Sequence, residues 1–218
     1  MRTLTLIRRG LVYYWRTNLA VMAGVAIAVS TLAGAGLVGE SVRASLREMA
    51  LGRLGATESV IAGPGFFREA LAGAFTPGCP MIAMEGLVIG DHGRAGNVAV
   101  YGVDARFWKF HSRDGKAPEG REILLSPALA AEIGAAAGDS IVVRIPKPSA
   151  IPAEWLHGRK DDAGRAIRFT VREASWEFSL RAQQGAVRAV FVPLARLQRE
   201  LDLPGKANTI LLGTGADE

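Results

Sequence analysis

The chain has one cysteine, Cys79, so it lacks the pair that an intrachain disulfide requires. It has no G-x-x-x-x-G-K-S/T phosphate loop and no G-x-S-x-G nucleophile elbow. Its three histidines, His92, His111 and His157, lack the spacing that places several ligands on one metal. These absences argue against an ATPase, a serine hydrolase and a metalloenzyme. We therefore expect no catalytic, cofactor or metal site.

One nucleotide-binding pattern does occur, at residues 34–39. The letters GAGLVG match G-x-G-x-x-G, and Glu58 follows at about the 20-residue distance expected of a ribose-binding acid. A dinucleotide site also needs a strand before these glycines, whereas here they end an apolar run. We therefore reject dinucleotide binding. Asp91 and His92 are adjacent but have no activated serine or cysteine beside them, which leaves an anchored hydrolase as the least supported hypothesis.

Charged side chains are missing from residues 17–39. Within this stretch, residues 19–38 form an apolar run that can cross a hydrocarbon core, which takes about 20 helical residues. No acidic residue precedes the run, but four arginines do: Arg2, Arg8, Arg9 and Arg16. The positive-inside rule places such a flank in the cytoplasm. We predict a cytoplasmic N-terminus at 1–16, a transmembrane helix at 17–39 and an extracytoplasmic remainder.

Two other interpretations of the N-terminus stay open. The small residues 33–35 resemble a signal-peptidase site, although the apolar run is longer than the roughly 7–15 residues of a signal peptide. We favour a retained helix. Tyr13, Tyr14 and Trp15 are of the type that occupies the headgroup layer, so the cytoplasmic boundary is expected near them. A short amphipathic helix at this place is also compatible.

Small residues recur at four-residue spacing along the apolar run. They are Ala20, Gly24 and Ala28 in one series and Ser30 and Gly34 in another. Such spacing lets a second helix approach closely in lipid, so we predict that these residues pack against neighbouring membrane helices. The alternative is chance, because a chain with 26 glycines meets this pattern readily.

The formal charge of +5 and the sequence pI near 9.8 raise the question of an anionic partner. Beyond the N-terminal arginines, however, basic residues alternate with Asp and Glu. No basic stripe carries the interleaved aromatic residues that stack on bases. We therefore expect the lipid bilayer, and not nucleic acid, as a partner.

The remaining sequence predicts an α+β fold. Residues 40–56 keep apolar side chains at helical spacing and are expected to extend the membrane helix as a stalk, followed by a strand-rich domain at 57–218. Ser126 is expected to cap a helix that ends at Gly134, and a second helix is expected at 193–201. The predicted strands are 58–63, 81–89, 97–103, 122–125, 140–145, 166–172, 176–180, 186–192 and 209–212, with a turn at 63–65 after the first.

A loop rich in proline and glycine is predicted at residues 146–164. It carries the densest polar cluster of the chain: Glu154, His157, Arg159, Lys160, Asp161 and Asp162. A loop of this length can dock a partner, and we predict a partner loop here, with a solvated loop as the alternative.

The order of several short segments resembles that of one transporter family. The segments are 41–46 (SVRASL), 58–63 (ESVIAG), 100–104 (VYGVD), 122–134 (EILLSPALAAEIG), 138–141 (GDSI), 192–198 (VPLARLQ) and 207–210 (ANTI). The chain resembles permease subunits of ABC exporters related to the macrolide exporter, the lipoprotein-releasing system and the cell-division permease, over nearly its whole length. The later membrane helices of that family are absent from the sequence.

The resemblance implies a non-enzymatic function in transport. It implies a permease subunit, or its N-terminal part, in a bacterial cytoplasmic (inner) membrane, with a periplasmic core domain. The expected partners are a separate ABC ATPase, a second permease copy and a periplasmic adaptor. The expected cargo is a lipoprotein, lipid, peptide or drug. The alternative is a membrane-anchored interaction or regulatory domain that transports nothing.

Overall fold

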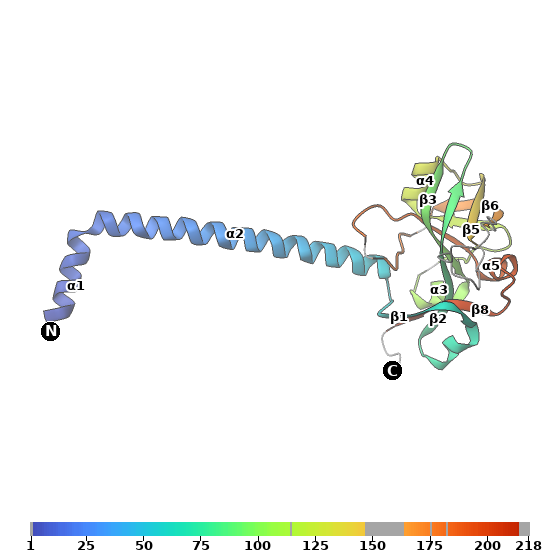
Figure 1. Cartoon of the computed structure of the whole chain (residues 1–218), viewed down its shortest axis with the longest axis horizontal. Helices are drawn as coiled ribbons and strands as arrows, with labels where there is room; N and C mark the ends of the chain where they lie inside the picture. Colours follow the sequence, from blue (N-terminus) through green and yellow to red (C-terminus); the bar gives the residue numbers. More distant parts are fainter. Residues whose placement is uncertain (1, 114, 147–163, 175, 182, 214–218) are drawn as a thin grey trace, which may run out of the picture. The chain divides into compact units, whose positions relative to one another are not determined.

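The computed structural model of this chain describes residues 2–113, 115–146, 164–174, 176–181 and 183–213 (Figure 1). Contacts between residues divide the chain into two units, residues 1–49 and residues 50–218. Helices and strands occur in a mixed order along the second unit, so the fold is α+β, as the sequence predicts.

The first unit is helical. Helix α1 (Arg2–Tyr13) precedes α2 (Trp15–Leu54), and α2 continues for 40 residues, into the second unit. At 1.5 Å per residue, a helix of this length extends for about 60 Å. It is the one described helix long and apolar enough to cross a membrane, by length and composition. Residues 17–39 and residues 40–54 of the predicted stalk therefore lie on a single helix without a break, and the helix ends two residues before the predicted end of the stalk.

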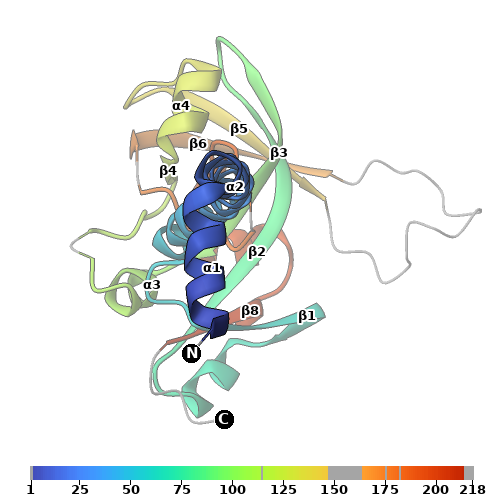
Figure 2. The same ribbon diagram turned by 90° about the vertical axis from the view of Figure 1, so that its left-hand side faces the viewer.

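Six strands of the second unit form a closed ring. The order is β2 (Gly78–Ile89), β3 (Arg94–Val103), β7 (Ala189–Pro193), β4 (Glu122–Leu125), β6 (Gly164–Ala174) and β5 (Ser140–Pro146). Strand β5 pairs back with β2 and closes the ring. The β3–β7 and β4–β6 pairs are parallel and the others antiparallel. The strands twist around one another in Figure 2.

A smaller sheet shares β2 with this barrel. Strand β1 (Ser59–Arg68) pairs with β8 (Lys206–Leu212), which in turn pairs with residues 78–81 at the start of β2. The rest of β2 belongs to the barrel. Strand β2 therefore joins the two sheets into one domain.

Alternate residues of the barrel strands point inward and form the main hydrophobic core. Ile82, Val100, Val143, Phe169 and Val190 are among the fully buried members. Helix α4 (Pro127–Ile133) and helix α5 (Leu194–Glu200) contribute apolar side chains to the same cluster: Leu129, Ile133, Leu194 and Leu197. Inside–outside alternation of this kind is what a pleated strand produces.

A second core lies on the outer face of β3, β7 and β4. Tyr101, Phe191 and Leu124 point outward from these strands and are covered by Phe178 and by Phe107 of helix α3 (Ala105–Phe110). The rings of Phe107 and Phe178 meet edge to face at 5.1 Å between centroids. This side of the barrel is therefore sealed from solvent.

Several sequence predictions are wrong in detail. Residues 176–180 form no strand, because their aromatic side chains fill the second core instead of pairing backbones. The expected turn at 63–65 lies inside β1, where an irregularity between Ala62 and Phe67 accommodates the two glycines and the proline. Helix α3 and the 3₁₀ helix η1 (Glu69–Ala74) are elements that the pattern did not predict.

Candidate functional site

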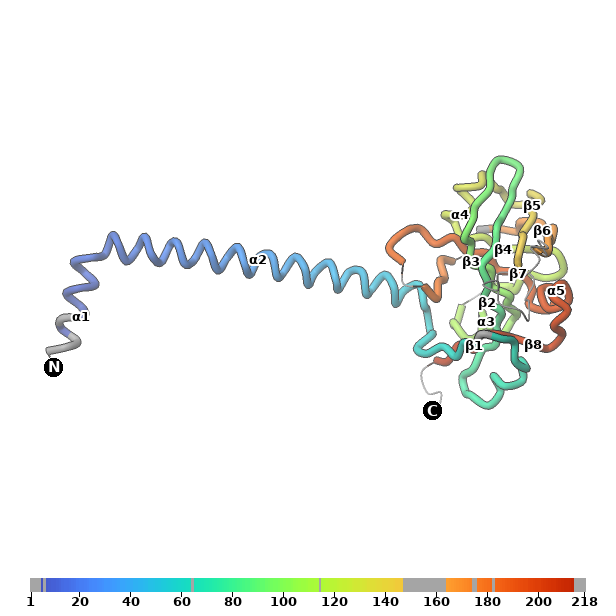
Figure 3. The backbone as a smooth tube through the Cα atoms, in the orientation of Figure 1, coloured from blue at the N-terminus to red at the C-terminus, as the bar shows by residue number. Residues whose placement is uncertain are grey.

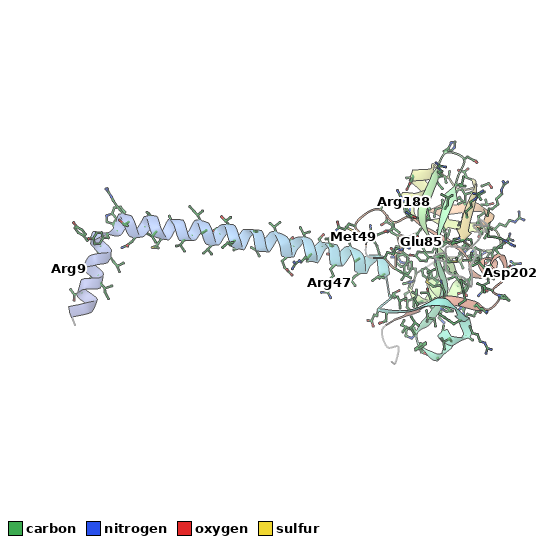
Figure 4. The ribbon with its side chains drawn as sticks, in the orientation of Figure 1. Arg9, Arg47, Met49, Glu85, Arg188 and Asp202 are labelled. Carbon is green, nitrogen blue, oxygen red and sulfur yellow. The ribbon has the colours of Figure 1, made fainter. Side chains whose placement is uncertain are left out.

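The predicted helix-packing residues all lie on α2. Ala20, Gly24, Ala28, Ser30 and Gly34 are exposed, and a Cβ added at Gly24 or Gly34 would meet no atom within 4 Å. The side chains along α2 project outward, with Arg47 and Met49 labelled in Figure 4. Residues 34–39 are helical, so the GAGLVG pattern has no preceding strand. The packing role of the five small residues stays a prediction.

The other sequence candidates form no site. The predicted partner loop lies outside the described residues. Asp91 and His92 are exposed in a bend between β2 and β3. Cys79 is buried, and burial raises the pKa of its thiol to about 12, so it stays protonated and unreactive. Within the described ranges, no group of three His, Cys, Asp or Glu side chains could hold a metal ion.

A largely buried arginine with several polar partners lies where α2 ends. Arg53 donates from Nη1 to the carbonyl of Gln183 at 2.6 Å, and its Nη2 lies 3.5 Å from Glu177 Oε2. The carbonyl of Arg53 accepts a hydrogen bond from the Ser179 amide at 3.3 Å. Only 12% of the Arg53 side chain is exposed. Glu177, Ser179 and Gln183 therefore all contact the last turn of α2.

His111 holds the next two residues. The Ala56 amide donates to His111 Nδ1 at 3.1 Å. Gly55 has a φ of +60°, and a Cβ at this position would lie 2.7 Å from both His111 Nδ1 and the Trp176 ring. Glycine adopts this left-handed conformation without strain and leaves the space that the two rings occupy. Helix α2 can therefore end at Leu54, and the chain can turn toward β1 while it packs against His111 and Trp176.

We call this arrangement the helix-end clamp. It consists of Arg53, Gly55, Ala56, His111, Trp176, Glu177 and Gln183. All of these residues belong to the second unit.

The electrostatics of the clamp keep His111 neutral. Burial, with a smaller contribution from the Arg113 charge, lowers the pKa of His111 from 6.5 to about 4. Because Nδ1 accepts the Ala56 amide, the ring proton is on Nε2. That nitrogen is buried and has no hydrogen-bond partner among the described residues. The rings of Phe107 and Trp176 meet the His111 ring edge to face, at 4.6 and 4.9 Å between ring centroids.

A pocket of about 170 Å³ adjoins the clamp. Trp108 and Trp176 contribute to its walls, and the Arg113 guanidinium stacks over the Trp176 ring at 4.0 Å from the centroid. Arg172 also lines the pocket. Its guanidinium donates hydrogen bonds to the Lys116 and Ala117 carbonyls and so holds the loop that contains them. The pocket has aromatic walls and no nucleophile among the described residues.

The domain begins and ends at one place. The Glu58 amide donates to the Leu212 carbonyl at 2.9 Å, and Ser59 pairs with Leu212. The Gly213 amide donates to the Pro77 carbonyl at 3.3 Å, and a Cβ on Gly213 would lie 3.3 Å from the Ala56 carbonyl oxygen. Figure 3 traces β1 and β8 side by side. The entry strand and the exit strand therefore lie next to the clamp.

Sequence reasoning missed the clamp. Arg53 and Gly55 are visible as the end of a helix, but their partners lie far along the chain, 130 residues away in the case of Gln183. His111 had no sequence neighbour to indicate a role. The only local signal was a glycine after an arginine at the helix end, which is common to many helices.

The solved structures similar to this chain include two domains of ABC transporters. The periplasmic region of MacB from Actinobacillus actinomycetemcomitans has 10% identity and a TM-score of 0.47, covering 77% of this chain and 80% of that chain. The extracellular domain of the ABC-type transporter YknZ from Gram-positive bacteria has 9% identity and a TM-score of 0.45, covering 72% and 84%. No protein-family model and no curated protein matches the chain. With TM-scores below 0.5, neither likeness decides the function.

Proposed function

We propose that this chain is the permease subunit, or the N-terminal part of the permease subunit, of a bacterial ABC exporter. Residues 17–39 span the cytoplasmic membrane, with residues 1–16 in the cytoplasm and residues 57–218 outside. A partner ATPase moves the outer domain through α2, and the domain acts on a lipoprotein, lipid, peptide or drug. A second permease copy and a periplasmic adaptor complete the assembly.

The single observation that carries this proposal is the continuity of α2. One helix runs from the uncharged segment at 17–39 to the clamp at Arg53–Ala56. A helix without a break transmits displacement along its axis, because each backbone hydrogen bond resists bending. A tether that only anchors a domain needs neither this rigidity nor a buried arginine at its end. The arrangement therefore favours mechanical coupling over simple anchoring.

The adjacent entry and exit of the domain support the same function. A domain inserted between two membrane helices must receive and return the chain on the same side. Strands β1 and β8 pair over the length that adjoins the clamp, which meets this requirement. The short segments that resemble exporter permeases fall on elements that build the domain, among them β4, α4 and α5.

Cysteine labelling tests the orientation. Because Cys79 is buried with a pKa raised to about 12, it reacts slowly and can be replaced by alanine as the background. Single cysteines at Thr5 and at Glu85, both exposed, are then treated with a membrane-impermeant maleimide on intact cells. We expect labelling of Glu85→Cys alone, with Thr5→Cys reacting only after permeabilisation. The reverse pattern contradicts the proposed topology.

Purification with a tag on the full chain tests the transport function. In mild detergent, we expect a Walker-containing ATPase and a second copy of the chain to co-purify and to hydrolyse ATP. A chain that purifies without any nucleotide-hydrolysing partner favours the anchored interaction domain. Because both hypotheses place the domain outside, the labelling experiment gives the same result for both, and only the presence of the ATPase separates them.

A further inference from the structure

The barrel has one covered side and one bare side. The outer faces of β7, β4 and residues 99–103 of β3 are buried under the second core. The outward residues of β5 and β6, Leu87 and Ile89 of β2, and Arg94 of β3 are partly or fully exposed. We call this second face the bare wall and define it by the outward residues at 87, 89, 94, 140, 142, 144, 166, 168 and 170. Their inward neighbours, such as Val88, Val143 and Ile167, are buried in the main core.

Strand register places the residues of the bare wall in rows. Arg94 pairs with Ile89, Ile89 with Val142, and Val142 with Arg168, so these four side chains lie across β3, β2, β5 and β6 on one face. In the next row, Leu87 pairs with Arg144. Ile89, Val142 and Leu87 are half-buried, and the three arginines are exposed. An aliphatic centre is therefore bordered by three cations.

The arginines of the bare wall differ from most others in the domain. Arg53, Arg106, Arg165, Arg172, Arg181, Arg188 and Arg196 each lie within ion-pair distance of a carboxylate. Within the described residues, by contrast, Arg94, Arg144 and Arg168 have neither an ion pair nor a side-chain hydrogen bond. None of the nine outward positions of the wall holds an acid. Among the residues that the structure describes, its positive charge is therefore uncompensated.

Arg144 and Arg168 lie close enough for their positive charges to repel each other when no partner is bound. Arg144 pairs with Ala166 and Val142 with Arg168, so the two arginines are diagonal neighbours on adjacent strands. Diagonal neighbours lie about 7–8 Å apart at their backbones, within reach of long side chains, and like charges at such distances repel. An opposing carboxylate would remove this repulsion, and guanidinium groups bind carboxylates in a bidentate manner.

From this surface we infer that the bare wall docks an acidic protein segment of another chain. Carboxylates of that segment pair with Arg94, Arg144 and Arg168, and its apolar side chains cover Leu87, Ile89 and Val142. An apolar centre with arginine at its border is typical of protein interfaces, where arginine is enriched and lysine depleted. Nucleic acid fits less well because the wall offers no aromatic side chain for base stacking. The inference stands independently of the transport function.

A labelled peptide rich in Glu and Leu, titrated against the full chain in nanodiscs of neutral lipid, provides the probe. We expect Arg144→Ala or Arg168→Ala to weaken binding about tenfold, equivalent to about 1.4 kcal/mol, because each variant loses a charge-assisted hydrogen bond. The double variant Arg144→Glu with Arg168→Glu should abolish binding. Lys109→Glu on α3, exposed beside the covered side of the barrel, is the matched control and should leave affinity within about twofold.

Three results overturn the inference. Equal weakening by Lys109→Glu and by the wall variants would show that the peptide senses only net charge. Vesicles of phosphatidylglycerol that bind through Arg144 and Arg168, while the peptide does not, would assign the wall to lipid headgroups. A gain in peptide affinity on deleting residues 147–163 would assign it to this chain's own loop. Unchanged urea midpoints in all variants exclude misfolding as the cause of lost binding.

Discussion

His111 combines an acceptor role with a buried, unpartnered nitrogen, and this makes the clamp sensitive to acid. Only the neutral ring can accept the Ala56 amide at Nδ1. Protonation would convert Nδ1 to a donor that faces another donor, next to the Arg113 charge that already disfavours a cation. The clamp therefore depends on His111 remaining unprotonated.

This dependence predicts a loss of stability at low pH. The pKa of His111 falls from 6.5 in the unfolded chain to about 4 in the folded one, so the unfolded state binds more protons between these values. The contribution is complete above about pH 6.5 and is lost as the pH falls toward 4. We expect a decrease of about 2–3 kcal/mol, allowing for partial screening. Urea titrations of the full chain in detergent, followed by tryptophan fluorescence, measure it.

The control for this titration is His92, which is exposed. His111→Gln should flatten the dependence on pH in this window, whereas His92→Gln should preserve it. If both variants keep the slope of the unmodified chain, then other groups cause the acid response and the neutral His111 is not important for the clamp.

Gly55 provides a second prediction at the residue scale. Gly55→Ala places a methyl group 2.7 Å from His111 and Trp176 in a left-handed conformation, and we expect a loss of about 3 kcal/mol. Gly120 has nearly the same φ, +58°, but no atom within 4 Å of an added Cβ, so Gly120→Ala should lose only about 1 kcal/mol. The difference between the two urea midpoints isolates the packing. Equal losses would mean that the rings simply move aside.

At the scale of elements, the sequence predicted most strands but fewer of the contacts that arrange them. The barrel strands alternate between apolar and polar residues, as in Ser140–Pro146, and this local pattern determines which face is buried. Residues 176–180 contain the same residue types, yet they form no strand. Their aromatic rings pack on Phe107 and Phe191, which no local pattern reveals.

Ser126 also shows that local sequence predicts an element but not its distant contacts. The sequence predicts a helix cap, and α4 does begin directly after it. Its hydroxyl forms no cap bond, however, because it donates to the Val187 carbonyl at 2.5 Å and accepts from the Ala189 amide at 3.1 Å. It therefore fastens β7 to the start of α4. The clamp was missed for the same reason, since its partners are distant in sequence.

Helix α2 carries a prediction at this scale. Gly24→Leu and Ala28→Leu each put a large side chain on the helix face that carries the small residues. They should weaken assembly with other membrane helices, because close approach in lipid depends on small side chains. Ala26→Leu adds a leucine to the opposite face, about 200° around the helix from Gly24, and is the matched control. Cross-linking of the chain in native membranes measures assembly. Equal weakening by all three variants would contradict a specific packing face.

For the whole molecule, the proposed function requires that α2 behave as a rigid connection. Seven glycines inserted between Arg47 and Glu48 interrupt the helix, whereas seven alanines add about two helical turns and keep its phase. Both insertions leave the clamp, which begins at Arg53, intact. We therefore expect unchanged urea midpoints for the domain in both variants.

The two insertions should differ in coupling. A dye is attached to Glu85→Cys in the Cys79→Ala background. In the protein without an insertion, adding ATP to the purified assembly should change the fluorescence of this dye. The alanine variant should keep most of this change and the glycine variant should lose it, since a glycine segment does not transmit displacement. Equal responses from both insertions would rule out α2 as the transmitting element. A response absent even without insertion would favour an anchored domain that interacts with other envelope proteins and transports nothing.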